Sequence, residues 1–225
     1  MSFYRKIKYF LVHSLMLSNK RAQELIEAGK IEIDGIKVYE NCLIEDHSEV
    51  KVNGKIERKK KEYVYYKFYK PRGFESTLNK SMVSNVSDFF REHHDLAIAG
   101  RLDKQSEGLL LLSNNGKWVE QLCNPKFEKE KEYLVWLDKN PNELFLSSFR
   151  TGVFIGDCTS KTCTCELIEP LVIKVILKEG KNRQIRRMCK VLGYEVVRLK
   201  RIRVHVFELS ALIEGAREQF YQIGD

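Results

Sequence analysis

The chain has 225 residues, of which 43% are hydrophobic and 31% charged, so it has enough apolar material for a core and is not a disordered chain. No apolar run approaches the ~20 residues of a membrane span and no cleavable signal peptide is recognisable, so we expect no membrane segment. Six cysteines are too few for a disulfide-rich chain, which favours the reducing cytoplasm. The net charge is +8, and residues 178–203 alone hold 10 basic and 2 acidic side chains, which indicates a polyanionic partner such as nucleic acid or, alternatively, only a basic soluble surface.

Residues 1–57 are predicted to form a small first unit. Apolar positions with helical spacing from Ile7 to Leu15 predict one helix, and Ser18 is a good N-cap for a second helix that Gly29 would end. The alternating stretch 31–38, centred on an Asp-Gly pair, predicts a hairpin, and residues 50–56 predict a third strand. The expected order is therefore αα-βββ.

Two cations stand at the start of the second predicted helix. Lys20 and Arg21 lie in its first turn, where the helix dipole disfavours positive charge. Together with the free amides of that turn they form a candidate phosphate-binding site. The alternative is an ordinary surface helix with an unfavourable charge pattern.

A charged linker, residues 58–62, is predicted to lead into a second unit, residues 63–225. Its sequence predicts helices at 86–92, 118–122, 144–151 and 183–192, and strands at 63–69, 109–113, 133–137, 153–155, 161–167, 171–177 and 195–204. The crossovers are too few and too short for a doubly wound sheet. We therefore expect an α+β fold with a mainly antiparallel mixed sheet flanked by helices.

The motifs of the common cofactor-binding folds are missing from the sequence. It has no dinucleotide fingerprint, no phosphate-binding loop of the Walker type and no nucleophile elbow. Cys158, Cys163 and Cys165 are clustered but lack paired Cys-x-x-Cys spacing, which argues against zinc. We expect neither a metal nor a cofactor.

Asp103 is the first candidate catalytic residue. It lies between Arg101 and Lys104 in a polar loop that is bracketed by Gly100 and Gly108 and precedes a buried strand. A carboxylate among cations stays ionised and can act as a nucleophile. A surface turn with ordinary ion pairs is the alternative interpretation.

A second polar segment surrounds the start of the helix predicted at 183–192. Cations again crowd a helix start, as in the first unit. The side chains concerned are Arg183, Gln184, Arg186 and Arg187.

These segments, taken in order, resemble the motifs of one enzyme family. Residues 100–112, Gly-Arg-Leu-Asp-x-x-Ser-x-Gly-Leu-Leu-Leu-Leu, look like the catalytic motif of bacterial rRNA pseudouridine synthases of the ribosomal small-subunit synthase A type. Residues 70–73, 131–135 and 179–188 resemble three further motifs of that family, and residues 3–57 resemble its S4 RNA-binding domain. Details around Ser106 and Met188 are most similar to a member that acts on the large ribosomal subunit. The stretch after Val204 departs from the family pattern.

The resemblance implies isomerisation of uridine to pseudouridine without cofactor, metal or ATP. Asp103 would be the nucleophile, attacking either the sugar or the base, and Arg186 would pair with it. Tyr133 would stack on the uracil, and Ile185 and Leu112 would line an apolar pocket. Arg101 would fill the gap that the flipped base leaves in the RNA.

The implied partner is ribosomal RNA, most closely 23S rRNA or a ribosomal assembly intermediate, bound by a monomer. Small-subunit rRNA and tRNA remain alternative substrates. A second class of function is a non-catalytic S4-type RNA-binding or ribosome-assembly factor. Such a protein would be expected to lose Asp103, Tyr133 or Arg186, and this chain keeps all three.

Overall fold

The computed structural model describes residues 6–221 and divides the chain after Tyr63 into two compact units. The first unit was predicted to span residues 1–57 and its S4 resemblance residues 3–57. Residues 1–5 of these ranges lie outside the described residues. Within the described chain, no helix has both the length and the apolar character needed to cross a membrane.

The first unit packs two helices against a small antiparallel sheet. Its helices are α1 (Ile7–His13) and α2 (Asn19–Glu27), and its strands run in the order β2-β1-β3-β4. Ser18 caps α2, its hydroxyl accepting a bond from the Arg21 amide, and Gly29 follows the helix with a φ of +62°. The core comprises Ile7, Leu11, Ala22, Leu25, Ile26, Ile31, Ile44, Val50 and Val52.

The prediction of three strands in this unit was wrong, because the sheet has four strands. The expected hairpin is present as β1 (Ile31–Ile33) and β2 (Ile36–Val38). The single strand expected at 50–56 is a second hairpin, β3 (Val50–Val52) and β4 (Lys55–Arg58). Asn53 and Gly54 turn between them with φ of 52° and 79°, the left-handed pair that Asn-Gly adopts in tight hairpins.

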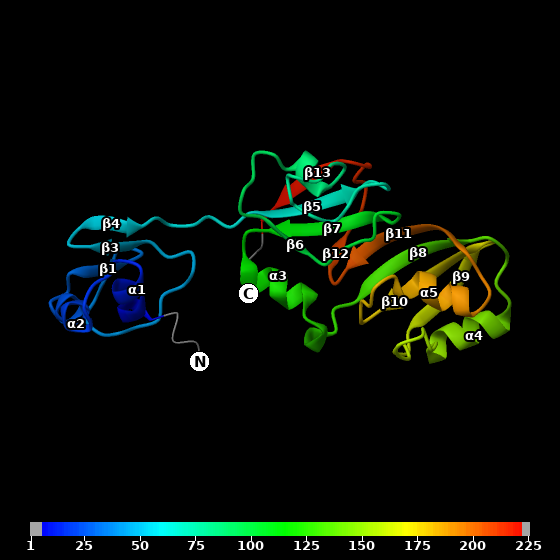
Figure 1. Cartoon of the computed structure of the whole chain (residues 1–225), viewed down its shortest axis with the longest axis horizontal. Coiled ribbons are helices and arrows are strands. Elements are labelled where there is room, and N and C mark those ends of the chain that lie inside the picture. Colours follow the sequence, from blue (N-terminus) through cyan, green and yellow to red (C-terminus); the bar gives the residue numbers. More distant parts are fainter. Residues whose placement is uncertain (1–5, 222–225) are drawn as a thin grey trace. The chain divides into compact units, whose positions relative to one another are not determined.

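The second unit is built on one mixed sheet, with the path β13-β5-β7-β11-β8-β10-β9 (Figure 1). β7 and β11 run parallel in its middle, and the other described pairs are antiparallel. The strands are β5 (Tyr65–Lys70), β6 (Ala97–Ala99), β7 (Glu107–Ser113), β8 (Lys131–Leu137), β9 (Thr164–Glu169), β10 (Val172–Leu177), β11 (Val196–Val204), β12 (Phe207–Glu208) and β13 (Arg217–Phe220).

Helices cover different parts of this sheet. α3 (Gly116–Cys123) packs on β6 and β7, α4 (Glu143–Thr151) on β9 and α5 (Gln184–Val191) on β11 (Figure 1). The short 3₁₀ turns are η2 (Val86–Phe89) and η3 (Pro125–Phe127). The predicted α+β class with a mainly antiparallel mixed sheet is confirmed.

Several local predictions in this unit need correction. Residues 86–92 contain only the η2 turn. Residues 153–155 form a single antiparallel bridge, Phe154 with Thr159, and not the predicted strand. The short strands β6, β12 and β13 were not predicted. They are two to four residues long, too short for a periodic pattern to be recognised.

The parallel contact between β7 and β11 depends on Gly108. Its φ is +107°, and a Cβ at this position would lie 2.2 Å from the carbonyl oxygen and 2.7 Å from the amide nitrogen of Arg201. Both atoms belong to the backbone of a central strand, so the neighbour has no side-chain freedom with which to move away.

We expect Gly108→Ala to lower the free energy of unfolding by roughly 3 kcal/mol or more, because overpacking and backbone strain add. Urea unfolding of the purified protein measures this. Gly116→Ala is the matched control, since Gly116 opens α3 with a normal φ and no atom lies within 4 Å of its added Cβ. A Gly108→Ala protein as stable as the control would contradict the close approach.

Candidate active site

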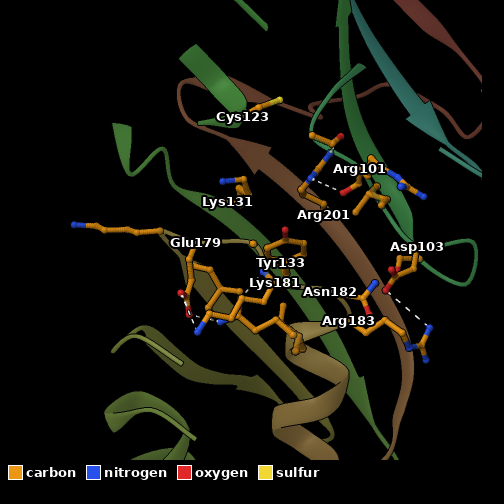
Figure 2. A pocket seen from close by; sticks show the side chains of 18 of the residues that line it. Arg101, Asp103, Cys123, Lys131, Tyr133, Glu179, Lys181, Asn182, Arg183 and Arg201 are labelled. Atoms are coloured by element: carbon orange, nitrogen blue, oxygen red, sulfur yellow. Dashed lines mark hydrogen bonds and ion pairs between the residues drawn. The ribbon is translucent and has the colours of Figure 1, made fainter. Parts of the chain in front are cut away.

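A pocket of about 400 Å³ opens beside the centre of the second unit's sheet (Figure 2). Four segments form its walls: the loop 100–106 before β7, residues 123–125 after α3, strands β8 and β11, and the segment 177–185 that leads into α5. Asp103, Tyr133, Arg183 and Ile185 all line it. The structure therefore brings together residues that are up to 82 positions apart in sequence.

The loop that carries Asp103 is held from several sides by groups outside it. The Ser76 hydroxyl donates to the Leu102 carbonyl at 2.7 Å and accepts from the Leu102 amide at 3.0 Å. On the other side of Asp103, the Gly73 amide donates to the Lys104 carbonyl at 2.7 Å. Asp103 thus stands between two fixed points of the backbone.

Arg186 contributes to this loop in a different way from the prediction. Its guanidinium donates to the Gln105 carbonyl and to the Val196 carbonyl, both at 3.0 Å, and ties the Asp103 loop to the start of β11. No ion pair between Arg186 and Asp103 is present among the described residues. The predicted pairing is therefore corrected: Arg186 binds backbone beside Asp103.

Arg183 is the cation that pairs with Asp103. Its Nη1 lies 4.0 Å from Oδ2 of Asp103, and both side chains are partly exposed (Figure 2). Arg183 is the N-cap of α5 in a left-handed conformation, with φ 48° and ψ 33°. The helix starts one residue later than predicted, which leaves Arg183 in the loop facing Asp103.

Gln184 and Glu179 fix the segment that carries Arg183. The buried Gln184 amide donates to Oε1 of Glu179 at 2.6 Å, and its oxygen accepts from the Lys181 amide at 3.0 Å. The Lys161 amide donates to the same Glu179 oxygen at 2.9 Å. Gln184 therefore lines the pocket as a structural brace, and its polar groups are already used inside the protein.

The apolar lining agrees only in part with the prediction. Ile185 lines the pocket, together with Leu102, Leu177 and Leu199. Leu112 does not: it is fully buried in the core, on β7, away from the pocket. Arg187 also lies outside the pocket lining and pairs with the exposed Asp157 at 2.5 Å.

The remaining predicted residues are exposed. Arg101 lies at the edge of the pocket and also borders a neighbouring hollow formed by Glu75, Ser76, Thr77 and Met82. In the first unit, Lys20 and Arg21 are exposed, and Arg21 pairs with Glu24 at 3.1 Å. This pair links two exposed side chains and contributes little to stability.

Several pocket residues were not predicted as site residues, among them the charged side chains of Lys131, Glu179 and Arg201. Lys131 lies two positions before Tyr133 on β8, so alternation along the strand could have indicated that both face the pocket. Arg201 gave no such signal, because one basic residue in a basic strand looks like a solvated one. Among residues 6–221 no group of His, Cys, Asp or Glu is placed to hold a metal.

The chemical character of the site follows from these contacts. A carboxylate that faces a guanidinium stands in an immobilised loop, opposite the buried ring of Tyr133 and apolar side chains. Such an arrangement can present a nucleophilic oxygen to a flat, partly apolar group held against the ring. Its surroundings are strongly basic, which suits an anionic substrate.

Comparison with known proteins gives consistent results. The family model described as RNA pseudouridylate synthase matches residues 63–190. The chain is 34% identical over 212 residues to the dual-specificity RNA pseudouridine synthase RluF of Escherichia coli (strain K12), covering 93% of this chain and 73% of that protein. It is 32% identical over 224 residues to the ribosomal large subunit pseudouridine synthase B of Bacillus subtilis (strain 168), covering 95% and 91%.

A solved structure shares the fold over nearly the whole length. A crystal structure of a pseudouridylate synthase superimposes with a TM-score of 0.68 at 24% identity, covering 96% of each chain. At that identity the likeness supports the architecture and carries no information on substrate.

Lys70 supports the Asp103 loop, and its burial makes the stability of the protein depend on pH. Its ammonium is fully buried and donates to the carbonyls of Pro71 and Phe74 at 2.7 and 2.8 Å, which shapes the turn whose Gly73 amide holds Lys104. Burial lowers the pKa of Lys70 from 10.5 to about 8.

Between pH 8 and 10.5 the unfolded chain therefore binds a proton at Lys70 that the folded chain has lost, so stability rises with pH across this window. We expect the free energy of unfolding of the wild type, relative to Lys70→Met, to increase by about 3 kcal/mol from pH 8 to pH 10.5. Urea unfolding of both proteins at several pH values measures the difference. A difference independent of pH would contradict the lowered pKa.

Proposed function

The chain belongs to the RNA pseudouridylate synthase family, and from this premise we propose that it isomerises a uridine of large-subunit ribosomal RNA to pseudouridine, with Asp103 as the nucleophile. It is an isomerase that acts on RNA. The observation that carries the proposal is the placement of Asp103: its loop is held at Leu102 and Lys104, and it faces Arg183 in the same pocket as Tyr133.

The reaction breaks the glycosidic bond to nitrogen and remakes it to carbon 5 of the same base. Asp103 attacks the sugar or the base to form a covalent intermediate, and the glycosidic bond to nitrogen breaks. The base turns, the bond to carbon 5 closes, and the bond to Asp103 breaks again. Carbon 5 loses its proton and the freed nitrogen gains one. Arg183, whose Nη1 lies 4.0 Å from the carboxylate, provides a positive charge beside Asp103. Arg186 acts through the backbone, since it holds the Gln105 carbonyl.

The base is held by stacking and by apolar contact. Uracil packs against the ring of Tyr133, with Ile185 and Leu199 behind it. To reach them it must leave the RNA stack, at a cost of a few kcal/mol. Arg101, exposed at the edge of the pocket, fills the space that the base vacates.

The choice of large-subunit RNA is supported by the name of the Bacillus subtilis relative, which matches nearly the whole chain. Small-subunit rRNA or tRNA is the alternative substrate, and the Escherichia coli relative carries the description dual-specificity. We propose that it acts as a monomer, since Asp103, Tyr133 and Arg183 of a single chain already meet in one pocket. We place it in the cytoplasm, in keeping with the free thiols of all six cysteines. We assign residues 1–57 to RNA binding as an S4-like domain.

Asp103→Asn tests the nucleophile. The variant keeps the shape of the side chain but removes the charged oxygen, so we expect turnover to fall by roughly 10⁴ or more while RNA affinity is retained. Release of tritium from 5-tritiated uridine in large-subunit rRNA measures turnover. Asp157→Asn is the matched control, because Asp157 also pairs with an arginine but lies outside the pocket. Turnover within tenfold of wild type in Asp103→Asn would remove Asp103 from this role.

Lys20→Ala/Arg21→Ala tests the first unit. Both cations oppose the dipole of α2, so the free protein should lose no stability, whereas RNA affinity should fall with little dependence on sequence. Each contact to a phosphate of unpaired RNA contributes about −0.7 to the slope of log affinity against log salt, so the slope should flatten by roughly 1.4. Binding to an rRNA fragment across a salt series measures this. An unchanged slope would mean that neither cation contacts phosphate.

A further inference from the structure

Within residues 6–221, Arg201 is a buried cation of the pocket wall without a carboxylate partner. Its side chain is 1% exposed, and its guanidinium donates only to backbone carbonyls: Leu109 at 2.8 Å, and Gly100 and Arg101 both at 3.4 Å. Neutral carbonyls leave the charge itself uncompensated. A buried ion without a partner costs several kcal/mol, so its retention at a pocket needs an explanation.

Lys131 adds a second cation at the same end of the pocket. It lies on the same face of β8 as Tyr133, and Arg201 is the residue of β11 that pairs with Tyr133. The Lys131 ammonium donates to the Lys129 carbonyl at 3.0 Å. Burial, and then the charge of Arg201, lower the pKa of Lys131, and Cys123 has a smaller opposite effect.

The acidic groups that line the pocket do not neutralise this end. Figure 2 shows Asp103 on the far side of Tyr133 from Lys131, and Asp103 pairs with Arg183. Glu179 is engaged by the amides of Gln184 and Lys161. Two cations, one buried and one half-buried, therefore face a hollow without an anion of the protein.

We propose that Lys131 and Arg201 bind one phosphodiester of the RNA strand, next to the uridine that stacks on Tyr133. This rests on the proposed function. If the base of the uridine lies on Tyr133 and its sugar points toward Asp103, the phosphates on either side of that sugar lie within a few ångströms of the uridine. Lys131 is two residues from Tyr133 along the strand, a distance of about 7 Å. The phosphate supplies the missing counter-charge and fixes the register of the strand against the nucleophile.

The contact is present before and during the chemical step, so it strengthens binding of substrate and transition state alike. Its loss should raise KM and leave kcat nearly unchanged. A charge-assisted hydrogen bond to phosphate corresponds to a change of about tenfold in affinity. A merely structural lysine would instead lower stability or kcat.

The experiment uses a set of rRNA fragments, each with one uncharged methylphosphonate linkage at a different position around the target uridine. With the wild type, we expect one linkage near the target to weaken binding about tenfold. Lys131→Met should bind the unmodified fragment about tenfold more weakly and show no further penalty at that linkage, while Lys131→Arg, which keeps the charge, should still show it. Lys190→Met is the matched control: it removes an exposed lysine of α5 outside the pocket and should keep the full pattern.

The possible results separate the two proposals. If Lys131→Met binds as tightly as wild type, or retains the same linkage penalty, the phosphate site is wrong. If Lys131→Met does not fold, the wild-type scan still decides, because the absence of any sensitive linkage beside the target overturns the site. A fragment that shows the sensitive linkage but is not isomerised by the wild type overturns the proposed function and leaves the phosphate site supported.

Discussion

The geometry of the active site depends on how the backbone carbonyls of one loop are bound. The loop 100–106 belongs to neither a helix nor a strand, and side chains from distant elements satisfy its carbonyls: Ser76 at Leu102, Arg186 at Gln105 and Arg201 at Gly100 and Arg101. Arg186 and Arg201 thus donate their hydrogen bonds to backbone carbonyls of this loop. This scaffold positions Asp103, the proposed nucleophile, and among the described residues Arg183 is the one that forms an ion pair with its carboxylate.

The same requirement explains the distribution of charge in the site. Guanidinium groups suit this task because each offers several donors in a fixed plane and stays protonated when buried. The basic segment 178–203 therefore serves two purposes that its net charge does not separate. Part of it holds protein carbonyls, as Arg186 and Arg201 do, and part of it faces the pocket, as Arg183 does.

Sequence reasoning predicted what local chemistry determines. Caps and turns such as Ser18, Gly29 and Asp34-Gly35 act within a few residues, and Asp103 and Tyr133 belong to motifs that keep their spacing. It failed where partners are far apart or elements are very short. Arg183, and not the predicted Arg186, pairs with Asp103 because of where α5 begins and how the backbone turns at its N-cap. The position of Leu112 in the core depends on which face of β7 packs against the helices. Asn53-Gly54 was overlooked although it carries the same hairpin signal as Asp34-Gly35.

The parallel pairing of β7 with β11 also has a consequence for how the chain acquires its native structure. Arg201 reaches carbonyls that are 92 to 101 positions earlier in sequence, and Arg186 reaches one that is 81 positions earlier. Contacts of such high order form late, because a long loop must close before they compensate its entropy. During synthesis the first unit can fold on the ribosome while the Asp103 loop still lacks its anchors. If the first unit binds RNA as proposed, such a nascent chain would hold RNA before it is able to modify it.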